Sequence, residues 1–275
     1  MLCGGTIFCD HASGLIDVRN QVTSGASDTL RSKAMFERMA ANHGVLIKSY
    51  RGDNGVFSSR DFRGELASQK QGLTLSGVGA HYQNGVAERA IQTVTSHARI
   101  MMLHSALRWP STTEASLWPF ALEYAAHIWN TTPKESCGGL SPLEIFSSSR
   151  MGGEFQELNH SHVWGSPAYV LDPTMQDGKK LPKRQPRSRR GVVLDVSPLH
   201  ASTVGEILNL TTGSITPQYH VVFDDWSTTV LAQEDYVPDT WEDLFIHHRI
   251  QSLEPDNIGT PLADEWFDED SRAER

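Results

Sequence analysis

The stretch Gly77–Arg108 constrains the fold most, because it joins a glycine-rich loop, Gly77–Gly85, directly to a long amphipathic helix expected over Val86–Leu107. The inward face of this helix is predicted from residues at helical spacing, namely Ile91, Val94, Ala98, Met101, Met102 and Ser105. A second, polar stripe holds Glu88, Gln92, Thr95 and Arg99. Glu88 therefore stands in the first turn of a rigid helix beside a loop, where the helix dipole favours a carboxylate even without any further role.

Before this helix the sequence alternates short strands with helices. The predicted strands are Gly4–Asp10, Leu15–Val22, Val45–Tyr50 and Leu73–Leu75, the first two forming a hairpin. A helix is expected from Ser27 or Asp28 to Asn42, with Leu30, Ala34, Met35, Met39 and Ala40 on its inner face, and another from Ser58 or Ser59 to Lys70. After the long helix, we expect a helix over Glu114–Asn130 capped by Thr112 or Thr113, and a short one from Ser141 to about Phe146. This order predicts an α/β region with a mixed sheet and flanking helices.

From His160 onward the chain reads as short β runs separated by Gly, Pro, Asp and Ser. They are Val163–Val170, Gly191–Asp195, Ser202–Leu208, Ser214–Pro217 and Tyr219–Phe223, which predicts a small all-β barrel. The basic run Lys179–Arg190, with seven of the 24 basic residues, falls between the first two strands. It is either a surface for phosphate backbones or a solvated, proline-interrupted loop. We expect three regions, over residues 1–150, 160–232 and 233–275, the last an acidic tail or linker.

Composition excludes several classes of protein. A net charge of −9 argues against a chain that coats nucleic acid along its whole surface. No apolar run reaches the length of a membrane span, and the start of the chain lacks the features of a signal peptide, so no membrane partner and no secretion are expected. The three cysteines form no CxxC pair, which is typical of a reduced intracellular protein and indicates no zinc module.

Three carboxylates fall at positions that a sheet edge could bring together. Asp10 ends the first strand, Asp53 follows a strand expected to lie beside it, and Glu88 opens the long helix. Three such carboxylates can hold two divalent cations for phosphoryl transfer, and hard oxygen ligands select Mg²⁺ or Mn²⁺. With 33 acidic residues the chain contains many such triples, so the residue types alone do not single this one out.

Short motifs around these carboxylates carry a family resemblance. They are Phe8-Cys9-Asp10 with Ser13, Ile47–Gly55 (IKSYRGDNG) and Gln83–Arg89 (QNGVAER), with further matches at Trp118, at Trp129-Asn130 with Pro133, and at Ser141–Glu144. On these residues the segment Thr6–Phe146 resembles the catalytic core of retroviral-type integrases, most closely those of copia-type (Pseudoviridae) retrotransposons. The interval between Asp53 and Glu88 is one residue shorter than is usual in that family.

The resemblance extends more loosely over Val163–Val230. There His162–Gly165 (HVWG) and Val221–Asp224 (VVFD) are similar to the SH3-like barrel that follows the core in copia-type polyproteins. The family also carries a His-His-Cys-Cys zinc domain before the core, and this sequence contains no such motif.

The resemblance implies an RNase H-like fold whose Asp10 bridges two Mg²⁺ or Mn²⁺ ions, with Asp53 on one ion and Glu88 on the other. The implied activity is DNA integration, the joining of a retroelement DNA 3′ end to target DNA, by a homo-oligomer that reaches the nucleus from the cytoplasm. Expected contacts to double-stranded DNA come from Asn54, Gln83, Asn84, Arg89 and Gln92, and from Lys179, Lys180, Lys183 and Arg184 of the basic run.

Two other functions remain open from the sequence. One is a non-enzymatic nucleic-acid-binding remnant of a retroelement polyprotein, suggested by the missing zinc motif and the basic run. The other is a nuclease of the same fold, because hydrolysis and strand transfer use the same carboxylates and differ in which hydroxyl attacks.

Overall fold

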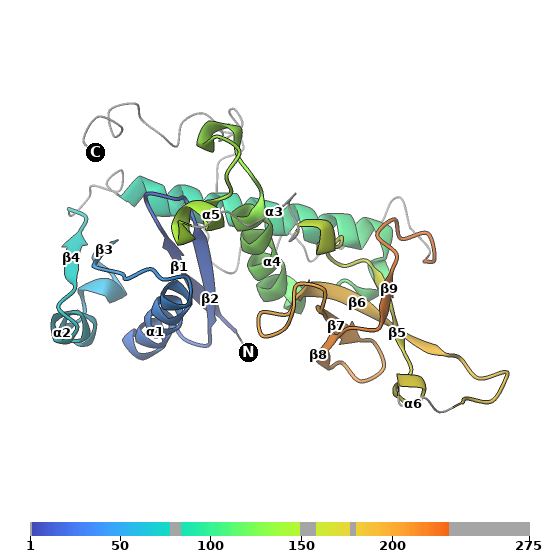
Figure 1. Ribbon diagram of the computed structural model, residues 1–275. Helices are drawn as coiled ribbons and strands as arrows, with labels where there is room; N and C mark the ends of the chain where they lie inside the picture. Colours follow the sequence, from blue (N-terminus) through green and yellow to red (C-terminus); the bar gives the residue numbers. More distant parts are fainter. Residues whose placement is uncertain (1, 78–83, 149–157, 177–179, 231–275) are drawn as a thin grey trace.

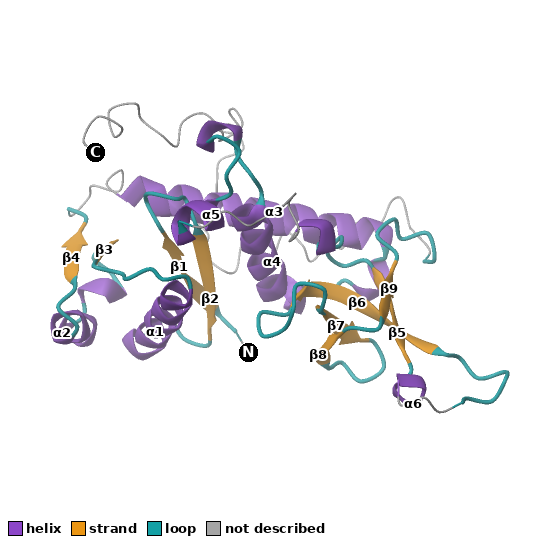
Figure 2. Cartoon of the chain, in the orientation of Figure 1, coloured by secondary structure: helices purple, strands orange, loops and turns teal. Residues whose placement is uncertain are grey.

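The computed structural model of the 275-residue chain describes residues 2–77, 84–148, 158–176 and 180–230. An α/β part and an antiparallel five-stranded sheet lie at opposite ends of the molecule, and the long helix α3 (Gly85–Arg108) extends across both (Figures 1 and 2). Within the described ranges, no helix is both long and apolar enough to span a membrane. The predicted acidic tail, 233–275, lies outside the described residues.

The first two strands form the expected hairpin. β1 (Gly4–Cys9) pairs antiparallel with β2 (Ile16–Gln21), from Gly4 opposite Gln21 to Cys9 opposite Ile16. Helix α1 (Ala26–Asn42) follows and packs against this hairpin. Helix α4 (Trp118–Thr131) contacts β2 as well, so the hairpin is held between helices.

A second pair of strands is separate from the hairpin. β3 (Ser49–Gly52) pairs in parallel with β4 (Gly72–Leu75), and α2 (Arg60–Ser68) connects them, with Ser59 accepting a bond from the Phe62 amide as the N-cap. In the described part of the chain β3 forms no ladder with β1, which differs from the single mixed sheet that the sequence predicts. The two pairs meet through side chains instead: the Phe8 ring lies edge-on to Tyr50 at 6.2 Å.

The third strand is shorter and later than predicted, because its ladder can only be as long as its partner. β4 has four residues. At the start of the predicted strand, the Val45 amide bonds to the Ala40 carbonyl and so belongs to the end of α1. The side chains of Val45 and Ile47 pack into the cluster around Phe8. The apolar residues of this segment therefore pack into the core, and their run does not mark the length of the strand.

The inner face of α1 is only partly the predicted one. Ala40 is buried and Met39 packs against the core as expected, but Ala34 and Met35 are exposed. Ser32, Lys33 and Phe36 are buried instead. The reason is that buried polar groups find partners here: Ser32 accepts a hydrogen bond from Gln21 at 2.8 Å. The cap prediction is also wrong, since the N-cap is Gly25.

Helix α3 confirms the predicted long helix to within one residue at each end. Its buried residues include Val94, Ala98, Met102 and Ser105 as expected, but Ile91 is 38% exposed because Ala90 and Thr93 face the core instead. Helix α4 begins four residues later than expected. Pro119 has no amide hydrogen, so it fits only the first turn of a helix, and the preceding residues form short 3₁₀ turns.

The remaining helices are short. α5 (Pro142–Ser147) carries the predicted start, a capping box between Ser141 and Glu144, and α6 (Pro173–Gln176) follows β5. The 3₁₀ helices of the described residues are Val56–Ser58, Pro110–Thr112, Ala115–Leu117, Glu135–Cys137 and Leu158–His160.

The C-terminal strands form one antiparallel sheet in the order β8-β7-β6-β5-β9. The strands are β5 (Pro167–Leu171), β6 (Ser188–Val196), β7 (Gly205–Asn209), β8 (Ile215–Gln218) and β9 (Val221–Phe223). The edge strands β8 and β9 do not pair with each other, so the described residues do not close the predicted SH3-like barrel. The basic run lies between β5 and β6 as expected, although its last arginines belong to β6.

The sheet and the α/β part share a core. Val192 and Leu194 of β6 are buried with Met102 of α3 and Tyr124 of α4. The chain enters the sheet through Gly165, whose φ of +77° and position against α3 exclude a side chain: a Cβ there would lie 2.2 Å from the Ser105 hydroxyl. The predicted domain boundary near residue 150 stays a prediction. The residues before and after it pack into one shared core.

Candidate active-site groove

A groove of about 480 Å³ brings together the three segments that carry the predicted carboxylates. It is lined by Asp10 at the end of β1, by Gly52 at the end of β3 and by Ala87 in the first turn of α3, among others. Asp53 and Glu88 each follow a lining residue directly in the chain, but they are exposed and do not line the groove themselves. Of the three predicted ligands, only Asp10 faces this space.

The carboxylate of Asp10 is held by the turn that follows β1. Its Oδ2 accepts hydrogen bonds from the Ser13 amide at 2.8 Å and from the Ser13 hydroxyl at 2.7 Å. Ser13 is buried, and its hydroxyl oxygen in turn accepts from the Leu15 amide at 3.2 Å. This arrangement fixes one carboxylate oxygen of Asp10 by two donors and leaves Oδ1 for other partners.

Asp53 occupies a tight turn beyond β3. Its Oδ1 accepts a hydrogen bond from the Gly55 amide at 3.0 Å. The neighbouring Asn54 donates its side-chain amide to the Ser76 carbonyl at 2.6 Å, which ties this turn to the end of β4. Asn54 therefore has a structural role in the turn, beside the DNA contact predicted for it.

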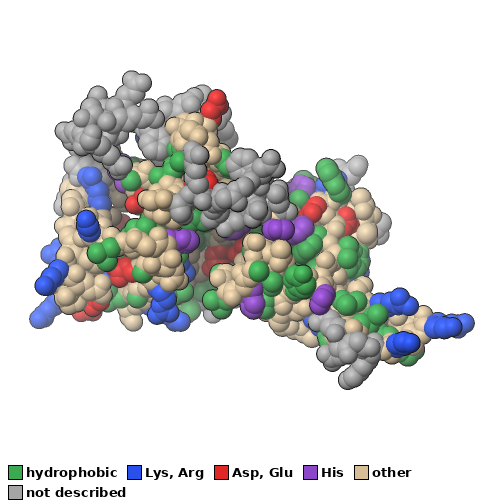
Figure 3. All heavy atoms as spheres, viewed as in Figure 1, with side chains coloured by type: hydrophobic (Ala, Val, Ile, Leu, Met, Phe, Trp, Pro, Cys, Tyr) green, Lys and Arg blue, Asp and Glu red, His purple; other side chains and the backbone are tan. Residues whose placement is uncertain are grey.

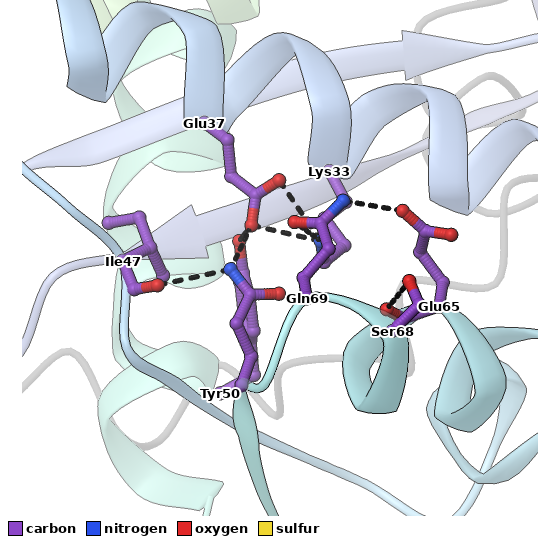
Figure 4. Close-up of polar contacts among 8 residues, drawn as sticks. Lys33, Glu37, Ile47, Tyr50, Glu65, Ser68 and Gln69 are labelled. Carbon is purple, nitrogen blue, oxygen red and sulfur yellow. Dashed lines mark hydrogen bonds and ion pairs between the residues drawn. The ribbon is translucent and has the colours of Figure 1, made fainter.

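A partly buried polar network fixes β3, and with it the Asp53 turn, against α1. Lys33 is only 1% exposed, and its ammonium bonds to Glu37 at 2.9 Å and to Gln69 at 3.3 Å (Figure 4). Glu37 also accepts a hydrogen bond from the Tyr50 hydroxyl of β3 at 2.9 Å. Burial, followed by the contact with Glu37, raises the pKa of Tyr50, so the phenol stays a donor. Gln71 completes the network with bonds to Glu37 and to the Ile47 carbonyl.

Glu88 is positioned by the start of α3. It is the acidic residue of the first turn, where the helix dipole favours its charge, and it is exposed. Asn84 stands at the N-cap, makes no side-chain cap bond and lines the groove beside Asp10. The amide of Asn84 and the carboxylate of Asp10 thus border the same space.

The donor types suit a hard divalent cation, but their positions do not form a metal centre. Carboxylate oxygens are the ligands that Mg²⁺ and Mn²⁺ prefer. Yet among the described residues, which include Asp10, Asp53 and Glu88, no three His, Cys, Asp or Glu side chains are grouped closely enough to hold a metal ion. Metal binding at this groove would require Asp53 and Glu88 to approach Asp10.

Two residues of α4 hold the Asp10 turn in a way that the sequence did not reveal. The Trp129 indole donates to the Gly14 carbonyl at 2.9 Å, and the Asn130 side chain bonds both to the amide of Ile16 at 2.9 Å and to its carbonyl at 2.6 Å. Only the place of Trp129 in the family motif distinguished it, since contacts across more than a hundred residues leave no local pattern.

A lysine and a cysteine lie close to this turn. The Lys134 ammonium is 3.1 Å from the centre of the Trp129 ring, and burial lowers its pKa to about 8. Burial, and then the neighbouring Asp10 charge, raises the pKa of Cys9 to about 12. The Cys9 thiol is therefore protonated and unreactive as a nucleophile at neutral pH.

The predicted DNA contacts are spread over two surfaces. Arg89 is exposed and Gln92 is half-exposed on α3. Lys180, Lys183 and Arg184 are exposed in the connection between β5 and β6, which projects from the sheet and carries a group of basic side chains (Figures 1 and 3). Gln83 and Lys179 lie outside the described residues.

Comparisons with solved structures show similarity to retroviral integrases. The chain is similar to the HTLV-2 integrase catalytic core domain in complex with magnesium, in its trimeric form (TM-score 0.39, 17% identity, 52% of this chain and 83% of that chain) and in its dimeric form (0.36, 16%, 52% and 82%). It is also similar to the simian T-cell lymphotropic virus intasome in complex with the PP2A regulatory subunit B56 gamma (0.40, 14%, 80% and 77%).

Sequence comparisons add no relative. No protein-family model matches the chain, and no curated protein matches it significantly.

Proposed function

We propose that this chain is an integrase-type polynucleotidyl transferase of a copia-type retroelement, with an RNase H-like core. The proposal rests on the motifs around Asp10, Asp53 and Glu88. The observation that carries it is the groove to which β1, β3 and the start of α3 all contribute. Its substrate would be double-stranded DNA, joined to a retroelement 3′ end by a homo-oligomer acting in the nucleus.

In this proposal each carboxylate has a separate task. Asp10, Asp53 and Glu88 would hold Mg²⁺ or Mn²⁺, which when bound would activate the attacking hydroxyl and stabilise the leaving oxygen. Ser13 orients the Asp10 carboxylate through its two hydrogen bonds. Asn84 and Arg89 at the start of α3 would contact DNA beside the groove, and the basic side chains between β5 and β6 would hold phosphates farther away.

A disintegration assay on branched DNA tests this proposal, because resolution of the branch requires only the core. The chain is incubated with Mg²⁺ or Mn²⁺, and Glu88→Gln and Asp10→Asn are compared with Asp61→Asn. Asp61 is a matched control, since it is also an exposed carboxylate in the first turn of a helix. We expect activity in the native chain and in Asp61→Asn but at least a hundredfold less in the other two.

The products of that assay also separate transfer from hydrolysis. A joined strand indicates a transferase, whereas cleavage without joining indicates a nuclease of the same fold. Activity that persists in Asp10→Asn and Glu88→Gln contradicts the assignment of these carboxylates.

A second candidate is a non-enzymatic nucleic-acid-binding remnant. It is favoured by the absence of a grouped metal-ligand set among the described residues and by the exposed basic side chains at Lys180, Lys183 and Arg184. It predicts DNA binding that weakens steeply with salt and that falls when these three residues are changed to Gln. DNA affinity that is independent of salt would count against it.

A further inference from the structure

The C-terminal end of α4 is hydrogen-bonded to the loop that carries Asp10. The Trp129 indole donates to the carbonyl of Gly14, and the Asn130 side chain bonds to both main-chain groups of Ile16. Ile16 pairs with Cys9 in the hairpin without using these groups, because the main-chain bond of the turn runs from the Asp10 amide to the Leu15 carbonyl at 2.9 Å. Asn130 therefore occupies the open edge of β2 much as a neighbouring strand would.

A hydrogen-bonded turn connects the residues that α4 holds to Asp10. The Gly14 amide donates to the Asp10 carbonyl at 2.9 Å, and Gly14 adopts a φ of +69°, which favours glycine. Between these two residues, Ser13 holds the Asp10 carboxylate. The residues that α4 holds, Gly14 and Ile16, are thus the far end of the turn whose near end is Asp10. Because hydrogen bonds join Asp10 to Ser13 and Gly14, a shift of residues 14–16 should also displace Asp10.

The chemistry of the two side chains suits this task. An asparagine amide offers a donor and an acceptor side by side, so it can satisfy an amide and a carbonyl of one residue at once. An indole offers a single rigid donor. The ring of Trp129 is itself covered by the Lys134 ammonium, which restricts its orientation. Replacing either residue by an apolar one would preserve bulk but remove the directed bonds.

We infer that Trp129 and Asn130 are positioning residues, which set the place of the Asp10 carboxylate by fixing residues 14–16. This inference rests on the proposed role of Asp10 as a metal ligand. Neither side chain lines the groove, so both act through the turn and not on a substrate or a metal.

The matched control is Asn20, which also joins β2 to α4 but at the other end of the strand. Its side-chain amide donates to Glu123 at 2.6 Å and to the Pro119 carbonyl at 3.2 Å. Asn20→Ala and Asn130→Ala therefore each remove a β2–α4 link of similar kind, and only the second link lies next to the Asp10 turn. Trp129→Phe keeps an aromatic ring at this position and removes the indole donor, at the cost of some packing, and it provides a second variant should Asn130→Ala fail to fold.

Two measurements on the whole chain test the inference. The first is Mn²⁺ affinity by titration calorimetry, with Asp10→Asn as reference. We expect Asn130→Ala and Trp129→Phe to weaken Mn²⁺ binding about fivefold to tenfold, an effect equal to roughly 1–1.4 kcal/mol, and Asn20→Ala to leave it within twofold. The second is hydrogen exchange at the Ser13 amide by NMR, which we expect to accelerate at least tenfold in Asn130→Ala but not in Asn20→Ala.

The outcomes separate this inference from the proposed function. If Mn²⁺ binding depends on Asp10 but is unchanged in folded Asn130→Ala and Trp129→Phe, the inference is overturned and the proposed function stands. If Asn20→Ala has the same effect as Asn130→Ala on both measurements, the two links are merely structural and the inference is likewise overturned. If Asp10→Asn binds Mn²⁺ as the native chain does, the proposed function fails, and the positioning inference fails with it.

Discussion

Two groups of partly buried carboxylates in this molecule have opposite surroundings. The first is the α1–β3 network, formed by Lys33, Glu37, Tyr50 and Gln71. The second, the junction acids, consists of Glu123 on α4, Asp195 on β6 and Glu206 on β7, which line a hollow of about 790 Å³ between the α/β part and the sheet, where Figure 3 shows acidic side chains. Glu37 is surrounded by donors and a cation, whereas the junction acids, each with at most one donor among the described residues, such as Asn20 for Glu123, lie among like charges.

In the α1–β3 network the partners outweigh burial. Burial acts to raise the pKa of Glu37, but hydrogen bonds from Gln71, Lys33 and Tyr50 and the charge of Lys33 lower it overall. A carboxyl group whose pKa is lower in the folded state stabilises the fold above its unfolded pKa, near 4.5. This contribution is lost as pH falls from that value through the folded pKa.

Among the junction acids burial and like charges act together. Burial, with the charges of Glu123 and Glu206, raises the pKa of Asp195 to about 8, although its own carboxylate accepts a bond from the Val196 amide. Burial also raises the pKa of Glu123 and of Glu206. The other charged groups near them are Asp17, paired with Arg19 at 2.7 Å, and His200.

The sign of the resulting pH dependence is opposite to that of Glu37. For Asp195 the folded state holds its proton more tightly than the unfolded chain, whose carboxyl titrates near 3.8. The stabilisation is complete below that pH and is lost as pH rises to about 8. The charged form of Glu37 thus stabilises the fold, whereas the charged form of Asp195 destabilises it. The difference lies in the groups that surround each carboxylate.

The largest effect is expected at Lys33. Lys33→Met leaves the half-buried Glu37 carboxylate without its cation. Loss of one partner of a fully buried pair costs about 3–5 kcal/mol of unfolding free energy, so we expect a loss at the lower end of that range. Urea unfolding at pH 7 measures the loss, with Lys48→Met as control because Lys48 is exposed. Equal stability losses in the two variants would show that the buried ion pair contributes nothing and would break the comparison.

A gain of stability is expected from Asp195→Asn. The amide removes the charge but can still accept from the Val196 amide, so the variant should gain on the order of 2–3 kcal/mol at pH 8 and almost nothing at pH 4. Unfolding curves at pH 4, 6 and 8 measure this, with Asp61→Asn as the exposed control. A gain of the same size at every pH would rule out the charge as its cause.

A smaller loss is expected from Tyr50→Phe. This change removes one hydrogen bond to Glu37 while Lys33 and Gln71 still donate to it, so about 1 kcal/mol should be lost. Chemical unfolding measures the loss, and Tyr219→Phe serves as control because that ring is 66% exposed. A cost equal to that of Lys33→Met would mean that the phenol, and not the ammonium, compensates Glu37.

The smallest effect is expected from Glu206→Gln. Glu206 acts on Asp195 through its charge and is more exposed than Glu123, so solvent screens it and the gain at pH 8 should be only a few tenths of a kcal/mol. High salt should reduce the gain further. In the Asp195→Asn background the gain should shrink, because the like charge that it relieves is already gone. If the gain in unfolding free energy is unchanged in that background, Glu206 does not act through the charge of Asp195.

Local structure was largely predictable from the sequence. The caps at Ser59 and Ser141, the ends of α3 and the β1–β2 hairpin depend on neighbouring residues, whose capping atoms and periodicity are visible in the chain. The motifs around Asp10, Asp53 and Glu88 likewise indicated which three segments would converge, and the groove contains all three.

Contacts between distant segments were decided only in the tertiary structure. The buried face of α1 includes Ser32 and Lys33, whose partners come from other segments of the chain. The same holds for the pairing of strands, since each ladder needs two segments of the chain to meet. The C-terminal sheet keeps open edges, and β1–β2 and β3–β4 form separate pairs.

The sequence by itself determined the segments, their chemistry and the candidate carboxylates, because helix caps, hairpins and motifs act over a few residues. The tertiary structure alone decided that Asn130 holds the Asp10 turn, that Lys33 is buried against Glu37 and that Asp195 faces other acids. Such pairings join residues far apart in the chain, and their free energy depends on burial and on the groups opposite, neither of which exists before the chain has folded.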